Sequence, residues 1–205
     1  MKVPKIEEII KASGIHSSKV FNIYIFGSRV YGNYKLNSDW DIIMVANNSV
    51  ESTEIRRGLF NIHVYVPDKF KKDLDWHRIN NLECIYAPNW AVLKEDIDYR
   101  KDFKINSKKI RHSISHTSSN SWVKCKKKLL VANEYNVGIK SLFHSIRIPM
   151  FGKQIMESNQ INDFTCANWV WSKILSKRWA WEELNNEFKE LHNEVLSDFR
   201  KLAKK

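Results

Sequence analysis

Two carboxylates and a glycine-serine turn are the residues of this chain whose types and spacing could do chemistry. Gly27 and Ser28 directly follow the apolar run 20–26, and a polar loop separates them from Asp39 and Asp41. Residues two apart on a strand point to the same side, so the two carboxylates are expected to converge. Adjacent carboxylates repel unless a cation lies between them, and Mg²⁺ binds a few carboxylates together with substrate phosphates. The pattern predicts a metal site beside a phosphate-sized turn.

The elements that position these residues are two strands. The run 20–26 is rich in β-branched and aromatic residues, which predicts a buried strand that ends at Gly27. A glycine lets the backbone come close to a ligand, and the hydroxyl of Ser28 with the amides of the next turn can hold phosphate oxygens. The segment 39–45 predicts a second strand, whose apolar residues hold the carboxylates rigidly. The alternative is a strand-turn-strand unit with solvated aspartates.

This combination resembles the DNA polymerase beta-like nucleotidyltransferase superfamily, whose signature is Gly-Ser, a short spacer and Asp-x-Asp. The segments 27–32 and 38–41 are most similar to small stand-alone nucleotidyltransferases of bacteria, phages and large DNA viruses. The resemblance implies an α/β (α+β) fold, in which a small mixed-sheet, polymerase beta-like palm lobe precedes an all-helical lobe. It also implies that Asp39 and Asp41 hold Mg²⁺ or Mn²⁺ as catalytic residues. The residues implied to contact a nucleoside triphosphate such as ATP are Gly27, Ser28, Arg29 and Ser38.

A third strand, predicted at 59–66 and ended by Pro67, carries the point at which the chain departs from this family. Active members usually have an acidic residue there that completes the metal site, and the matching position is Asn61. His63, two residues further on, lies on the same face of the strand as Asn61. The resemblance implies that the missing charge weakens the hold on a second Mg²⁺. Glu83 lies in a Leu-Glu segment that resembles one of the subfamily and is the candidate substitute acid; an ordinary surface glutamate or a structural ion pair is the alternative.

Apolar residues take a helical period from about residue 107, so we expect a nucleotidyltransferase catalytic lobe at 1–106 and a helical lobe at 107–205 packed against it. Lys140, His144 and Arg147 fall at i, i+4 and i+7, so they project from one helix face. Such a face suits a triphosphate, and it resembles the Lys and Arg helix that faces the nucleotide in related small nucleotidyltransferases. The alternative is a solvated basic face.

The charge of the chain is unevenly distributed. The net charge is +11, and the segment Lys101 to Lys128 contains nine Lys or Arg against the single acid Asp102. A basic segment of this kind is typical of proteins with a polyanionic partner, so we expect it to guide a nucleic acid acceptor such as an RNA end. A solvated helix face is the alternative. His112 and His116 lack a third ligand at a suitable spacing, so they are interpreted as part of the basic surface and not as a zinc site.

The composition of the chain limits the classes of protein to which it can belong. The chain has 205 residues and is 43% hydrophobic, which indicates a folded protein. No apolar run reaches the length of a bilayer-spanning helix and no signal peptide is recognised, so a cytoplasmic location is expected, or the host cytoplasm if the protein is viral. Three widely spaced cysteines are interpreted as reduced core residues. Tryptophans near the C-terminus are expected in the core, with base stacking or a dimer contact as alternatives. The oligomeric state stays open.

The sequence therefore predicts a metal-dependent nucleotidyltransferase that moves a nucleoside monophosphate from an NTP to an acceptor hydroxyl. RNA, a protein hydroxyl and a small molecule remain open as acceptors. Two alternatives belong to other classes. Because Asn61 replaces an acid, the chain could be a catalytically weakened module that binds nucleotide or RNA. Because the catalytic lobe is small, it could instead be an interaction protein of the antitoxin type.

Overall fold

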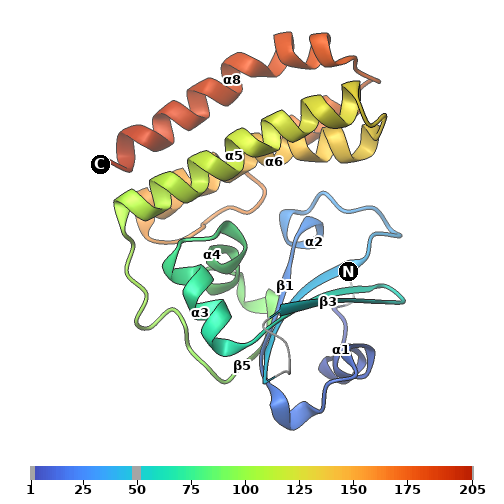
Figure 1. The fold of residues 1–205 in the computed structure, drawn as a ribbon, viewed down its shortest axis with the longest axis vertical. Coiled ribbons are helices and arrows are strands. Elements are labelled where there is room, and N and C mark those ends of the chain that lie inside the picture. Colours follow the sequence, from blue (N-terminus) through green and yellow to red (C-terminus); the bar gives the residue numbers. More distant parts are fainter. Residues whose placement is uncertain (1–2, 48–51, 205) are drawn as a thin grey trace. The chain divides into compact units, whose positions relative to one another are not determined.

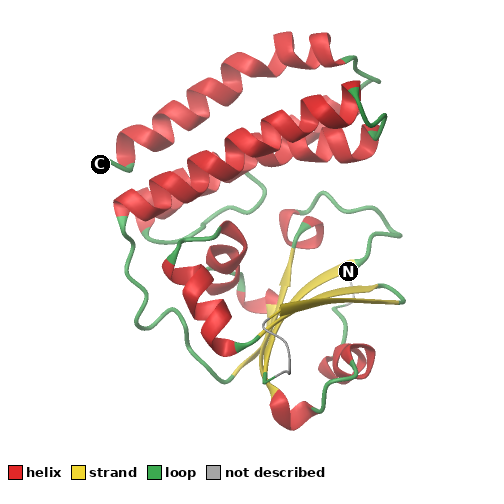
Figure 2. Ribbon diagram, viewed as in Figure 1, coloured by secondary structure: helices red, strands yellow, loops and turns green. Residues whose placement is uncertain are grey.

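A computed structural model describes residues 3–47 and 52–204 and divides the chain into two compact units, Met1–Lys104 and Ile105–Lys205 (Figure 1). The first unit combines a five-stranded mixed sheet with short helices, and the second is helical. Colouring by secondary structure places every strand of the described residues in the first unit (Figure 2). The predicted fold class, an α/β lobe followed by a helical part, is confirmed.

The sheet of the first unit has the strand order β3-β4-β2-β1-β5. Strands β2 and β4 are parallel, while the pairs β1/β2, β1/β5 and β3/β4 are antiparallel. The bounds are β1 Val20–Phe26, β2 Trp40–Ala46, β3 Ser52–Arg57, β4 Phe60–Tyr65 and β5 Val92–Glu95. Because β2 lies between the other two strands that carry predicted site residues, the start of β2 adjoins both the end of β1 and the start of β4.

The centre of the sheet is buried on both faces. Ile23, Ile42 and Val64 lie on one face, Tyr24 and Ile43 lie on the other, and each is at most 1% exposed. Strands covered on both sides read as nearly continuous apolar runs, which is why β1 and β2 are recognisable in the sequence. Strand β4 instead alternates buried and partly exposed residues, as a half-buried strand does. Burial of the strand interiors fixes the strand ends that carry the polar site residues.

Four α-helices complete the first unit: α1 Ile6–Ser13, α2 Ser28–Tyr31, α3 Pro67–Asp75 and α4 Ile79–Ile85. Two 3₁₀ turns lie at Ser17–Lys19 and Asn89–Ala91. Helix α3 begins with Pro67, whose fixed φ and missing N–H suit the first position of a helix. Helices α2 and α4 both pack on β1, so they lie next to the strand end that precedes Gly27.

The second unit contains α5 Ser107–Leu130, α6 Tyr135–Ser158, α7 Asn168–Leu175 and α8 Trp181–Leu202. Helices α5, α6 and α8 pack side by side (Figure 1). Their core includes Ile114, Phe143, Phe151 and Phe199, each at most 2% exposed. Among the described residues, no helix is both long and apolar enough to cross a membrane. The three cysteines are free thiols.

Two strands were not predicted. Strand β3 is polar and largely exposed at one edge of the sheet, and it lacks the apolar alternation that marks a half-buried strand. Strand β5 is short and occupies the other edge. The second strand also begins one residue later than predicted, because its pairing with β4 starts at Trp40 opposite Phe60. Asp39 therefore lies just before β2, and Asp41 lies inside it.

Candidate active site

The backbone of Gly27 lies against the carboxylate of Asp41. Strands β1 and β2 are antiparallel with Phe26 opposite Asp41, so the turn after β1 adjoins the start of β2. A Cβ atom added to Gly27 would lie 2.5 Å from Asp41 Oδ2, closer than any side chain allows. Its φ of +77° also lies in the region that favours glycine. Only glycine lets this carboxylate touch the turn.

Ser28 opens a single helical turn directly after this contact. The backbone N–H groups of Val30 and Tyr31 donate to the carbonyl of Gly27, at 3.0 and 3.1 Å. The turn closes at Gly32, whose φ is +76°. Two glycines thus flank a short turn held by backbone hydrogen bonds, and Ser28 is its first residue, directly after the glycine that contacts Asp41.

Arg29 holds the loop that carries the first carboxylate. Its guanidinium is buried, and Nε donates to the backbone carbonyl of Asp39 at 3.1 Å while Nη2 donates to that of Ser38. The guanidinium carbon lies 4.0 Å from the ring centre of Trp40 and 5.0 Å from that of Tyr34. These contacts make Arg29 a residue that positions Asp39, and Ser38 contributes to this clamp through its carbonyl.

Asn61 lies directly beside Asp41. The two residues are opposite each other on the parallel strands β2 and β4, and Asn61 Nδ2 donates to Asp41 Oδ1 at 3.1 Å. Asn61 Oδ1 is buried and, in the described structure, accepts no hydrogen bond. His63 lies next along the same face, with Nε2 3.4 Å from Asn61 Nδ2 and its ring edge-on to Phe26.

Glu83 lies elsewhere in the interior of the first unit. It is 2% exposed, and the hydroxyl of Tyr31 donates to its Oε2 at 2.5 Å. This bond joins α4 to α2. Within residues 3–47 and 52–204, no three His, Cys, Asp or Glu side chains are grouped to hold a metal ion, so Glu83 does not form such a group with Asp39 and Asp41.

Two charged residues of β3 lie on the same side of the sheet, and sequence reasoning missed them. The register places Arg56 opposite Asn61 and Glu54 opposite His63. Arg56 Nη2 and Nε donate to Glu54 Oε1 at 2.7 and 3.0 Å. The hydrogen bond to Glu54 is the main reason that the pKa of Arg56 is raised, and the charges of the two aspartates add to it. Only the strand register, which the polar β3 sequence does not reveal, places this ion pair near the site.

The oxygen atoms of Asp39, Asp41 and Asn61 are of the types that suit a divalent cation. Asp39 is exposed and Asp41 is partly buried, so both carboxylates are accessible. Asn61 Oδ1 is a buried amide oxygen without a donor. Carboxylate and carbonyl oxygens are the ligands that suit Mg²⁺ and Mn²⁺, which commonly complete their coordination with water and substrate phosphates. Two carboxylates and one amide oxygen carry less negative charge than three carboxylates.

The predicted basic face of the second unit lies on α6. Arg147 is 3% exposed, and its guanidinium lies 4.6 Å from the ring centre of Phe151. Its Nε donates to His144 Nδ1 at 3.3 Å. Burial, followed by the charges of Arg147 and Lys140, lowers the pKa of His144 to about 3. His144 is therefore a neutral acceptor at physiological pH, while Lys140 is exposed. The basic face of α6 is therefore not uniformly exposed to solvent, as the alternative interpretation would require.

Two solved structures show distant similarity to this chain. Among solved structures, a nucleotidyltransferase-like protein from Exiguobacterium sibiricum is 12% identical, with a TM-score of 0.35, and the alignment covers 96% of this chain and 72% of that one. Spectinomycin adenyltransferase AAD(9) from Enterococcus faecialis, crystallised with ATP and spectinomycin, is 15% identical with a TM-score of 0.44, covering 96% and 99%. No curated protein sequence matches the chain.

A family match covers more than half of the sequence. Residues 5–126 match the family described as polymerase beta, nucleotidyltransferase. This stretch includes all five strands, the turn at Gly27 and the paired residues Asp41 and Asn61. The resemblance inferred from the Gly-Ser and Asp-x-Asp segments is thereby confirmed, and the chain belongs to the polymerase beta nucleotidyltransferase family of enzymes.

Proposed function

We propose that this protein transfers a nucleoside monophosphate from an NTP to an acceptor hydroxyl, with Mg²⁺ or Mn²⁺ held by Asp39 and Asp41. The observation that carries the proposal is the close approach of Gly27 to Asp41 Oδ2. A phosphate bound at the Gly27-Ser28 turn would lie next to a carboxylate that can hold a cation. Such adjacency of phosphate and carboxylate is what metal-assisted phosphoryl chemistry requires.

Each residue of the first unit has a defined task in this proposal. The Ser28 hydroxyl donates to a phosphate oxygen, and Gly27 lets the Asp41 carboxylate lie against the turn that binds the phosphate. Arg29 holds the Asp39 backbone, and Asn61 orients the Asp41 carboxylate through its amide N–H. The bound cation would offset the charge that develops on the phosphates.

The reaction forms one bond and breaks one bond. The acceptor oxygen attacks the α-phosphorus, the bond between that phosphorus and the bridging oxygen to the β-phosphate breaks, and pyrophosphate leaves. The proton of the acceptor hydroxyl passes to water. No residue of the described site is assigned as the general base, since the position where the family usually has an acid is occupied by the amide of Asn61.

We also propose that the basic face of α6 binds phosphate oxygens. Arg147 is buried but carries a guanidinium whose shape suits bidentate contact with phosphate, and the exposed Lys140 acts as a point charge. His144 accepts the Nε–H of Arg147 and so fixes its orientation. We assign the catalytic task to the lobe expected at 1–106 and the accessory task to the lobe expected at 107–205.

The acceptor proposed here is an RNA end. Support comes from charge, because residues 105–205 contain 18 Lys and Arg against 9 Asp and Glu. An excess of this size in one unit attracts polyanions over long distances. A protein hydroxyl or a small molecule carries less charge and would gain less from it.

Label transfer tests the proposal. The protein is incubated with each α-labelled NTP, Mg²⁺ or Mn²⁺ and total RNA, beside the variants Asp39→Asn and Asp41→Asn. We expect label on RNA with the natural sequence and at least a hundredfold less with either variant, since each removes one cation ligand. NTP binding with equal label on RNA in all three proteins would contradict the proposal.

A second function is favoured by one observation. The neutral amide of Asn61 stands next to Asp41, where the family usually has an acid. The protein would then bind NTP and a cation without transferring anything. Tight NTP binding by the natural sequence, lost in Asp41→Asn, together with no label transfer from any NTP, is the result that this alternative predicts.

A further inference from the structure

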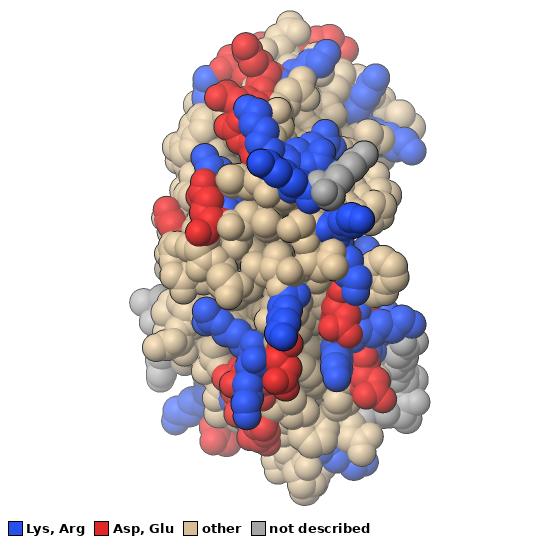
Figure 3. Space-filling view, turned by 90° about the vertical axis from the view of Figure 1, so that its left-hand side faces the viewer, with Lys and Arg blue, Asp and Glu red and all other residues tan. Residues whose placement is uncertain are grey.

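A basic groove lies on the second unit between α5 and α8. Its volume is about 900 Å³. The lining residues are Lys108, Arg111, His112, Ser115, His116, Ser119 and Arg200. The space-filling view shows Lys and Arg side chains gathered near the end of α8 (Figure 3). We refer to these seven residues as the α5/α8 groove.

The chemistry of the α5/α8 groove is that of an anion site. Three of its seven residues are Lys or Arg, two are His and two are Ser, with no Asp or Glu among them. All seven side chains can donate hydrogen bonds, and the cations form the charge-assisted bonds that phosphate favours. The lining therefore matches a ligand that is rich in phosphate and poor in cationic groups.

Two guanidinium groups of the groove are held by the protein itself. Arg111 Nη1 donates to the backbone carbonyls of Arg200 and Ala203, the latter at 2.9 Å. Arg200 Nε donates to Ser115 Oγ at 3.0 Å. These bonds join α5 to the end of α8 and to Ala203 directly after it, and an arginine has five N–H donors. The described contacts thus orient both side chains and use one nitrogen of each, which leaves further donors for a ligand.

The length of the groove favours a strand over a single phosphate. Positions 108, 111, 112, 115, 116 and 119 recur every three or four residues, so they form one face of α5. From 108 to 119 this face extends roughly 16 Å, at 1.5 Å per residue. Charges in one strand of B-DNA repeat about every 3.4 Å along the axis, so a groove of this length spans several nucleotides.

A stacked histidine pair adds a surface suited to bases. The rings of His112 and His116 have centres 5.8 Å apart and planes only 12° from parallel. Asn120 Nδ2 lies 2.8 Å from His116 Nε2 and fixes that ring. Proteins that bind single strands combine a positively charged groove with flat side chains on which bases stack.

We propose that the α5/α8 groove binds the phosphodiester backbone of a single nucleic acid strand. RNA and DNA share this backbone, and the test includes both. The further claim that the bound strand is the acceptor rests on the proposed function. Binding itself does not, since it needs neither NTP nor a cation.

The test measures strand binding by the full chain through fluorescence anisotropy with labelled twelve-nucleotide RNA and DNA. The main variant is Lys108→Gln with Arg200→Gln, and a second is Lys108→Gln with His112→Gln, which leaves both positioned arginines in place. Both change exposed or partly exposed side chains. Thermal unfolding of each variant checks that it folds.

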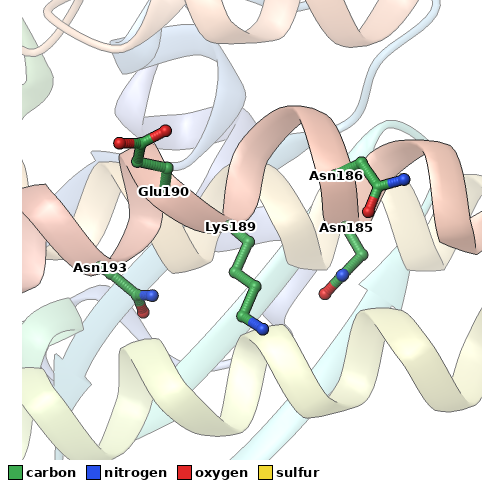
Figure 4. Close-up of a pocket in the computed structure, with 5 residues that line it drawn as sticks. All are labelled: Asn185, Asn186, Lys189, Glu190 and Asn193. Atoms are coloured by element: carbon green, nitrogen blue, oxygen red, sulfur yellow. The ribbon is translucent and has the colours of Figure 1, made fainter.

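A matched control removes a lysine of α8 outside the groove. Lys189 lines a separate, smaller hollow of about 360 Å³, whose five lining residues all belong to α8 and include Glu190 (Figure 4). We expect Lys189→Gln to keep its Kd within about twofold of the natural sequence. The groove variants should weaken strand binding about tenfold or more, and the slope of log Kd against log salt should fall by about one for each phosphate that the variant no longer binds.

Four outcomes bear on this inference and on the proposed function. Equal weakening by the groove variants and by Lys189→Gln would overturn the inference, and so would competition by inorganic tripolyphosphate as effective as that of the oligonucleotide. Strand binding that depends on the groove, without label transfer, supports the inference while the proposed function fails. Loss of label transfer to RNA in the groove variants, with the NTP affinity unchanged, supports both this inference and the proposed function.

Discussion

The amide of Asn61 donates to the carboxylate of Asp41 across two parallel strands, with 3.1 Å between Nδ2 and Oδ1. The bond occupies one oxygen of Asp41, while the other lies against Gly27. Asn61 thus holds the second carboxylate in place and contributes no charge. In the proposed metal site, Asp41 would thus be firmly positioned, while the electrostatic hold on a cation would be weaker than with a third carboxylate.

Substitution of Asn61 tests how the positioning of Asp41 and the charge of the site each affect cation binding. Asn61→Asp should raise Mg²⁺ affinity and increase kcat about tenfold, because a third charge strengthens cation binding. Without metal the same variant should unfold at a lower temperature, since two adjacent carboxylates repel. Asn61→Ala is the control for loss of the hydrogen bond alone. Unchanged metal affinity in Asn61→Asp would show that Asn61 does not face the cation site.

A second prediction concerns Gly27. Gly27→Ala should destabilise the fold by about 1–3 kcal/mol and abolish NTP binding, because the new methyl group meets Asp41 Oδ2 and strains a positive φ. Gly58 provides a matched control, with φ +58° and no atom within 4 Å of an added Cβ. Urea unfolding of both variants separates the two causes. Equal losses of stability would mean that the contact with Asp41 costs nothing.

The role of Glu83 is tested by conservative substitution. Because it is buried and accepts a bond from the Tyr31 hydroxyl, we expect Glu83→Gln to lower the Tm by several degrees. Its kcat, measured well below the Tm, should stay within about threefold of the natural sequence. Tyr31→Phe should destabilise similarly, as it removes the donor. A hundredfold loss of kcat in Glu83→Gln, with an unchanged Tm, would assign Glu83 a catalytic task.

The low pKa of His144 predicts a pH dependence of stability. Its folded pKa of about 3 lies below the ordinary value of 6.5, so the unfolded chain binds a proton first as the pH falls. The contribution of neutral His144 to the free energy of unfolding is fully present above about pH 6.5 and declines as the pH falls toward 3. Between pH 7 and pH 5 the natural sequence should lose about 2 kcal/mol more than His144→Gln. Urea unfolding at both pH values measures this, and parallel losses would contradict it.

Much of the first unit could be predicted because its central strands are buried on both faces. Nearly continuous apolar runs mark β1 and β2, alternating apolar residues mark β4, and the Gly-Ser and Asp-x-Asp segments identify the strand ends. The position of Asn61 beside Asp41 follows from parallel pairing, which the sequence implies only through the resemblance.

Other features depend on contacts between distant residues. Arg29 reads as a residue free to contact phosphate, yet its guanidinium is bonded to the carbonyls of Ser38 and Asp39. Strand β3 is an edge strand whose polar sequence has no periodic signal, so the ion pair of Arg56 and Glu54 beside Asn61 was not foreseen. Side-chain direction and strand register decide both cases.

Transfer from two separately labelled preparations of the same NTP tests the central claim most directly. The protein is given one NTP labelled at the α-phosphate and, separately, the same NTP labelled at the γ-phosphate, each with Mg²⁺ and RNA. The account predicts that the α-label alone reaches the acceptor, with equimolar pyrophosphate released, and that Asp41→Asn abolishes both. Transfer of the γ-label, or an α-label signal that survives in Asp41→Asn, would contradict it.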